Sequence, residues 1–88
     1  MMKVYAKPIR MIAWFENDGI LTPVRFQMQD DSKQNIAVKV DKITVREEEK
    51  LAGNRMFIYK CQSVIDGVER LYELKYEVNA CKWFLWKM

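Results

Sequence analysis

The 88-residue sequence contains no histidine and has only two cysteines, two prolines and three glycines. Histidine is the commonest general base and metal ligand, so its absence removes the first candidate for both roles. Cys61 and Cys81 form no Cys-x-x-Cys pair and therefore predict no structural zinc site. We expect two free thiols rather than a disulfide, and we expect no bound metal or cofactor.

Long apolar runs are also missing. No run approaches the roughly 18 apolar residues of a membrane-spanning helix. The apolar, basic stretch at 1–15 is interrupted by Lys7, Pro8 and Arg10, which is not typical of a signal peptide. Half of the residues are hydrophobic and 31% are charged, a composition typical of a folded domain. We predict a single domain over residues 1–88 and a cytoplasmic location.

Alternation with period two dominates the chain and predicts antiparallel β-structure. The strongest local signal is Asp66-Gly67, which predicts a two-residue type I′ hairpin joining strands at about 54–65 and 68–78. Its register places one largely apolar set of pairs on one face: Ile65 with Val68, Ser63 with Arg70, Cys61 with Tyr72, Tyr59 with Leu74, and Phe57 with Tyr76. The opposite face pairs Lys60 with Glu73, an attractive cross-strand couple.

A second hairpin is predicted with Asp18-Gly19 at its tip. The expected pairs are Ala13 with Val24, Met11 with Phe26, Ile9 with Met28, Arg10 with Gln27, Ile12 with Arg25, and Trp14 with Pro23. A polar turn at 30–33 then leads to a third run, in which residues 36, 38 and 40 alternate. The parity changes after this run and predicts a bulge or bend near Asp41-Lys42.

One short helix is expected at 45–52. Thr44 and Glu47 have the spacing of a capping box, three consecutive glutamates favour a helix start, and Gly53 supplies a stop. Asn79-Ala80 then turns the chain into a last strand at 82–88. The sequence therefore predicts an all-β domain of about six antiparallel strands in meander order, curled into a small barrel or roll.

The side chains that carry chemistry are few and dispersed. Ser32, Ser63 and both cysteines lack a histidine partner, and no glycine-rich phosphate loop is present. The glutamates are expected as solvated helix-start and surface ion-pair residues. Arg70 opposite Ser63 is expected to extend from the end of the hairpin to water. We therefore predict that the protein is not an enzyme.

The net charge of +3 is unevenly distributed. Both ends of the chain carry basic residues without acidic ones, and the first and last strands of a closed meander are often neighbours. The candidate interaction face comprises Lys3, Lys7, Arg10, Ile12, Trp14, Lys82, Phe84, Trp86 and Lys87. Cations combined with stacking rings are typical of small β-barrels that bind single-stranded nucleic acid.

The same residues favour a protein interface more strongly. Both terminal segments have apolar residues on both faces of the expected strand, whereas a single core covers only one face. Exposed Trp, Phe and Met beside Lys and Arg are typical of interfaces, and terminal strands are expected to form sheet edges that pair with another chain. The predicted function is a protein-interaction module, whose partner is either another protein or a second copy that forms a homo-oligomer through the terminal strands; the alternative is nucleic-acid binding.

Several structural motifs span most of the chain. They are Pro8 before an alternating strand, the hairpin Gly19…Pro23-x-x-Phe26, the run Glu69-Arg70-Leu71-Tyr72-Glu73-Leu74-Lys75-Tyr76, and the closing Trp83-x-Leu85. Together they resemble a type of small, stand-alone bacterial all-β protein of uncharacterised function. The resemblance implies a small bacterial β-barrel of the cytoplasm. It implies no activity and assigns no functional residue.

Overall fold

The computed structural model describes residues 2–29 and 32–88. These residues form seven β-strands, one more than the sequence predicted. They are β1 (Val4–Phe15), β2 (Leu21–Gln29), β3 (Asn35–Lys39), β4 (Lys42–Leu51), β5 (Asn54–Ile65), β6 (Val68–Glu77) and β7 (Lys82–Lys87). Of the predicted turn at 30–33, residues 30 and 31 lie outside the described residues. The all-β class is confirmed.

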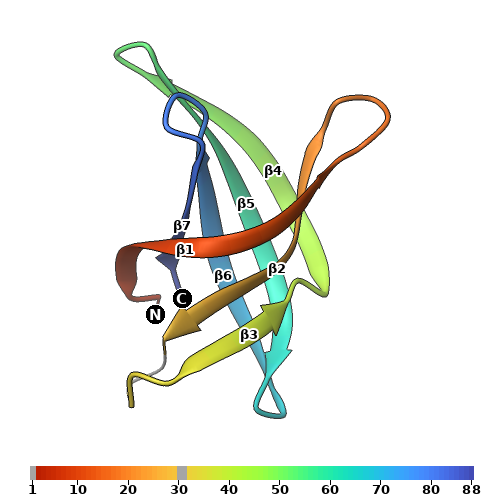
Figure 1. Cartoon of the computed structure of the whole chain (residues 1–88), viewed down its shortest axis with the longest axis vertical. Coiled ribbons are helices and arrows are strands. Elements are labelled where there is room, and N and C mark those ends of the chain that lie inside the picture. The colour runs from red at the N-terminus through yellow and green to blue at the C-terminus, as the bar shows by residue number, and fades with distance from the viewer. Residues whose placement is uncertain (1, 30–31) are drawn as a thin grey trace.

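The strands form one antiparallel sheet in the order β3-β2-β1-β7-β6-β5-β4, which curls into a half-barrel (Figure 1). The first and last strands are neighbours, and Lys3 and Met88 exchange backbone hydrogen bonds of 2.8 and 3.0 Å. The expectation that the terminal strands form sheet edges is therefore wrong. The edges are β3 and β4, because the meander opens between them and closes where the chain ends meet.

The hairpin of β5 and β6 has the predicted register along its full length, from Ile65 opposite Val68 to Met56 opposite Glu77. Its turn residues, Asp66 and Gly67, have φ angles of 51° and 75°. Positive φ at both positions is what a type I′ turn requires. The aspartate–glycine pair and the apolar alternation predict the same register, so the sequence alone was sufficient to predict this hairpin.

The helix expected at 45–52 is wrong. Residues 42–51 form β4, which pairs with β5 from Lys42 opposite Gln62 to Leu51 opposite Asn54. Ala52 and Gly53 have φ angles of 50° and 83°, so they form a two-residue turn rather than a helix end. A helix of two turns is marginal in water, whereas β4 pairs with β5 along the whole segment.

The hairpin of β1 and β2 differs from the prediction in two compensating ways. Its loop is Asn17–Gly19, three residues rather than two, and the Glu16 carbonyl accepts from the Gly19 amide. Ala13 therefore lies opposite Pro23 rather than Val24, and Trp14 opposite Thr22 rather than Pro23. A register shift next to Ile12 leaves Val24 as the extra residue, which restores the predicted pairs of Ile12 with Arg25, Met11 with Phe26, and Arg10 with Gln27.

Strand β1 belongs to two parts of the sheet. It pairs with β7 from Val4 to Ile9 and with β2 from Arg10 to Phe15. The predicted pair of Ile9 with Met28 is wrong, because the two strands separate beyond Arg10: Ile9 lies opposite Trp83, and Met28 lies opposite Ile36 on β3. Pro8, which has no amide hydrogen, lies near this change of partner.

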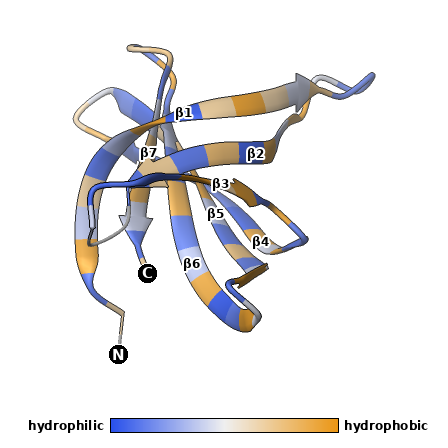
Figure 2. Cartoon of the chain, turned by 60° about the horizontal axis from the view of Figure 1, so that its bottom comes forward, coloured by the Kyte–Doolittle hydropathy of each residue, from blue (hydrophilic) through white to orange (hydrophobic). Residues whose placement is uncertain are grey.

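The core fills the concave side of the sheet, and the strands alternate between apolar and polar residues (Figure 2). Its largest fully buried side chains are Tyr59, Tyr72, Phe26, Leu74 and Leu85. The predicted bend at Asp41-Lys42 is confirmed: it separates β3 from β4, and the Asp41 amide donates to the Gln62 carbonyl at 3.2 Å. This corner brings β3 close to β5.

Candidate functional site

The outer side of β1, β2 and β3 carries basic side chains without acidic ones. None of the three strands contains Asp or Glu. Met11 and Ala13 pack against the core, so Arg10, Ile12 and Trp14 lie on the opposite side of β1 by alternation. Phe26 and Val38 are buried, which likewise turns their neighbours Arg25 and Lys39 outward. We define the cationic face by Arg10, Ile12, Trp14, Arg25, Gln27 and Lys39.

Two cations lie directly opposite each other on this face. Arg25 pairs with Lys39 across β2 and β3, and both side chains are exposed. Arg10 lies one pair further along, opposite Gln27. Like charges directly opposite on neighbouring strands are destabilising. Three cations on adjacent strands with no carboxylate among them create a positive potential that an anionic partner would relieve.

A shallow hollow lies within the cationic face. Its volume is about 260 Å³, and its lining includes Arg10, Ile12, Arg25, Gln27 and Ala37. Trp14 is 62% exposed further along β1. The face therefore combines cations, an amide and an exposed indole ring, and every polar group in it is accessible to a ligand.

The β7 half of the predicted interaction face has a different environment. Lys87 forms an ion pair with Glu73 at 3.9 Å. Lys75 lies 4.0 Å from the ring centroid of Trp86 and 3.6 Å from Glu49. Trp86 and Phe84 are half-buried. Glu73 and Glu49 thus balance the cations of this half, and Lys75 covers the Trp86 ring, so this half lacks the unopposed positive charge of the cationic face.

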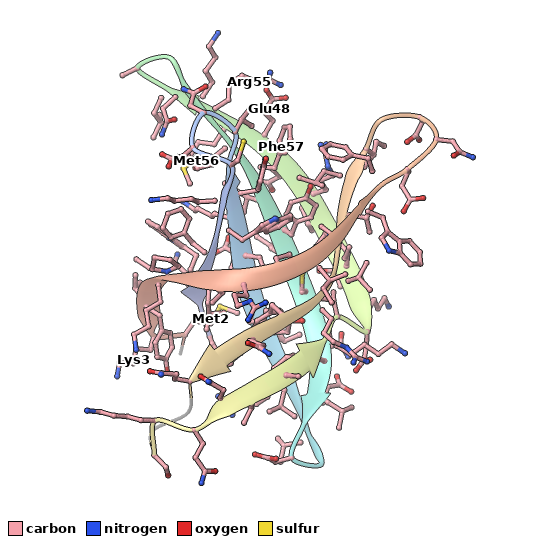
Figure 3. The ribbon with its side chains drawn as sticks, viewed as in Figure 1. Met2, Lys3, Glu48, Arg55, Met56 and Phe57 are labelled. Atoms are coloured by element: carbon pink, nitrogen blue, oxygen red, sulfur yellow. The ribbon has the colours of Figure 1, made fainter. Side chains whose placement is uncertain are left out.

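The remaining predicted residues divide between the two halves. Lys82 is exposed on β7, opposite Glu77. Lys3 lies beside the β1–β7 end, with its Nζ 5.3 Å from the ring centroid of Tyr5 (Figure 3). Lys7 lines a groove between β1 and β2. The nine predicted residues therefore do not form one surface, although β1 and β7 are neighbours as expected.

Sequence reasoning missed Arg25, Gln27 and Lys39. The unopposed positive charge was predicted only at the chain ends, because residues 16–79 taken together carry more acidic than basic residues. Within that segment the acids concentrate in the loops and in β4–β6, whereas 21–29 and 35–39 contain none. Comparing charge strand by strand would have identified these residues.

Both cysteines are free, Cys61 buried and Cys81 exposed. Burial raises the pKa of the Cys61 thiol to about 12, so this thiol is protonated at neutral pH. Within residues 2–29 and 32–88 there is no group of three or more His, Cys, Asp or Glu that could hold a metal ion. The same residues include no helix long and apolar enough to cross a membrane.

Ser63 and Arg70 lie opposite each other as predicted, and Arg70 is exposed at the hairpin end as expected, whereas Ser63 is buried. Comparison with known proteins finds no matching family model, no matching curated protein and no matching solved structure. The resemblance to small bacterial β-domains therefore remains a prediction, and the function must be argued from the geometry.

Proposed function

We propose that this chain is a non-enzymatic module that binds single-stranded nucleic acid across its cationic face. The observation that carries the proposal is the absence of Asp and Glu from three adjacent strands that present Arg10, Arg25 and Lys39. A phosphate backbone supplies the missing negative charge in a regular row. Its binding would remove the repulsion between Arg25 and Lys39 that the free protein bears.

A single strand fits this surface better than a duplex. Trp14 is exposed on the same side of β1 as Arg10, so it offers a flat ring beside the cations. Unpaired bases stack on such rings irrespective of sequence, whereas the bases of a duplex are already stacked on one another. We therefore expect tighter binding to a single strand than to a duplex of equal charge.

The experiment is a titration of a fluorescein-labelled oligonucleotide, followed by anisotropy at several salt concentrations. Three phosphate contacts predict a slope of about −2 in the plot of log K against log salt. Arg25→Gln and Lys39→Gln should each reduce the slope by about 0.7. Lys50→Gln changes the net charge equally on the opposite edge strand, β4, and should leave the slope unchanged. Absence of binding at low salt would refute the proposal.

A second candidate, the docking of a second copy of this chain, is favoured by one observation. The β1–β2 hairpin exposes a run of apolar side chains: Ile12, Trp14, Phe15 and Ile20, with Phe15 74% exposed. Self-association would use this hairpin, because β1 and β7 already pair with each other. Light scattering should then show a dimer that Phe15→Ser dissociates. A monomer at high concentration would remove this candidate.

A further inference from the structure

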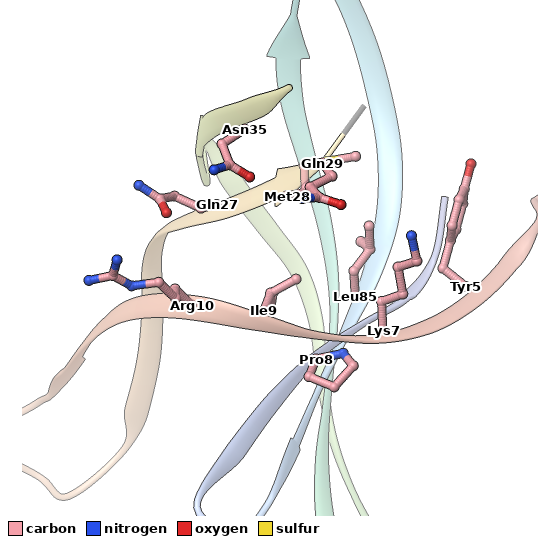
Figure 4. A pocket seen from close by; sticks show the side chains of 10 residues that line it. All are labelled: Tyr5, Lys7, Pro8, Ile9, Arg10, Gln27, Met28, Gln29, Asn35 and Leu85. Carbon is pink, nitrogen blue, oxygen red and sulfur yellow. The ribbon is translucent and has the colours of Figure 1, made fainter. Parts of the chain in front are cut away.

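A groove of about 700 Å³ lies between β1 and the end of β2 (Figure 4). It exists because β1 changes partner. Up to Ile9 the strand pairs with β7, whereas beyond Gln27 strand β2 pairs only with β3, so the two strands diverge. The divergence leaves part of the barrel end uncovered. The volume is within the range of about 300–1,000 Å³ that is usual for small-molecule sites.

The lining of the groove separates into an apolar bottom and a polar margin. Ile9, Met28 and Leu85 project into the space between the strands in Figure 4. The margin carries three side-chain amides and two cations: Gln27, Gln29, Asn35, Lys7 and Arg10. Tyr5 stands at one end with its ring half-buried. None of the described lining residues is acidic.

This combination matches the chemistry of a nucleobase. A base has two flat faces that favour apolar or aromatic contacts, and its edges carry both hydrogen-bond donors and acceptors. Side-chain amides donate and accept, so they can satisfy either kind of edge group. A purely apolar ligand would make no use of the three amides and two cations, whereas a free anion would make no use of the apolar bottom and the tyrosine ring.

The groove and the cationic face are contiguous. Arg10 and Gln27, which lie opposite each other, line both the groove and the hollow of about 260 Å³ on the outer side. A strand whose phosphates follow the cationic face would therefore reach the groove at Arg10. We infer that the groove receives one unpaired base of the bound strand, held between Tyr5 and the apolar bottom and contacted at its edge by the amides. This inference rests on the proposed function.

The test uses the full chain and a series of oligonucleotides, each with one abasic nucleotide at a different position. An abasic nucleotide keeps the phosphate charge and removes only the base. If one base enters the groove, short oligonucleotides of a single site length should lose roughly tenfold in affinity at one position more than at the others. Tyr5→Leu should weaken the intact oligonucleotide about as much and should abolish the extra loss at that position.

Gln29→Ala should change the preference among the four homopolymers more than it changes their mean affinity, because side-chain amides read base edges. Trp86→Leu is the matched aromatic control on the balanced face of β7 and should change none of these values. Equal losses at all abasic positions, with Tyr5→Leu binding like wild type, would overturn the inference while leaving the proposed function intact. Failure of the unmodified oligonucleotide to bind would overturn both.

Discussion

Among residues 2–29 and 32–88, Ser63 is the buried residue that is neither hydrophobic nor aromatic, and it joins two strands that are not neighbours in the sheet. Its Oγ donates to the Lys39 carbonyl at 2.6 Å, so the Tyr72 hydroxyl, also at 2.6 Å, donates to Ser63. One side chain thus satisfies groups from β3 and β6. The sequence indicated an inward serine but not its partners, because these depend on the corner at Asp41.

Ser63→Ala should lower the free energy of unfolding by about 1–3 kcal/mol, because it leaves the Lys39 carbonyl and the Tyr72 hydroxyl unpaired in the core. Urea denaturation measures the change. Val64→Ala is the matched control on the same strand, since Val64 is 61% exposed, and it should change the stability by less than about 0.5 kcal/mol. Equal effects of the two substitutions would contradict the role of Ser63.

The two thiols should differ in reactivity. The pKa of Cys61 is raised to about 12 by burial, so its reactive thiolate is scarce at pH 8, whereas Cys81 is exposed. A thiol reagent at pH 8 should therefore label one cysteine in the native protein and both in denaturant. Labelling of both in the native state would contradict the burial of Cys61.

The same pKa shift has a defined effect on stability. Because the pKa of Cys61 is above its ordinary value of 9.0, folding favours the protonated thiol. This contribution to the free energy of unfolding is complete below about pH 9 and decreases as the pH rises toward 12. Cys61→Ala should flatten the decline of stability over that window, and Cys81→Ser should not.

At the scale of elements, Ala52 distinguishes the turn from the predicted helix. Its φ of 50° is unfavourable for alanine, and asparagine tolerates this conformation better at the first position of a type I′ turn. Ala52→Asn should therefore stabilise the protein by about 0.5–1 kcal/mol, measured by thermal and urea denaturation. In a helix the same substitution would destabilise, because alanine has the highest helix propensity.

The elements that the sequence predicted are those in which local and cross-strand signals agree. Asp66-Gly67 and the alternation around it support the same register. At 44–53 the local signals conflict with the pairing. Thr44 and Glu47 favour a helix cap, but the Thr44 hydroxyl donates to the Lys60 carbonyl at 3.1 Å. Residues 44–53 by themselves carry no information about their pairing with β5, so the sequence of this segment predicts the helix that its capping residues favour.

The same distant partner determines what the glutamates of β4 do. Glu48 accepts from Arg55 Nε at 2.6 Å, and this hydrogen bond lowers the pKa of Glu48. Arg46 lies with its guanidinium carbon 4.4 Å from the ring centroid of Phe57. Phe57 and Arg55, whose side chains are labelled in Figure 3, belong to β5. Side chains that indicate a helix start in isolation are cross-strand partners here.

The candidate site was predictable only in part, because it too depends on which strands are neighbours in the sheet. The basic residues of β1 are evident from the sequence, and Arg10, Ile12 and Trp14 lie on the cationic face as expected outward residues. Arg25 and Lys39 join them only because β2 and β3 follow β1 in the sheet. The groove was not predictable, since it depends on the separation of β1 from β2 beyond Gln27.

At the scale of the whole molecule, the adjacency of the chain ends predicts tolerance of circular permutation. Lys3 and Met88 are hydrogen-bonded, so a short linker from residue 88 to residue 1 should not strain the sheet. A permutant opened between Asn17 and Asp18, in the β1–β2 loop, should melt cooperatively with a wild-type circular dichroism spectrum. A permutant opened between Tyr59 and Lys60, inside β5, is the control and should not fold.

The joining of β1 to β7 also bears on how the molecule folds. The hairpins form from contacts between close neighbours in sequence, but the pair of Val4 with Lys87 connects nearly the whole chain. Contacts of such long sequence separation are slow to form because their loop-closure entropy is large. During synthesis, the backbone groups of β1 that bond to β7 stay unpaired until β7 has been made. The rate of folding should therefore be limited by the pairing of β1 with β7. The permutant opened in the β1–β2 loop makes this pair local but turns the pairing of β1 with β2 into the contact that spans the chain, so it should fold no faster than the natural order.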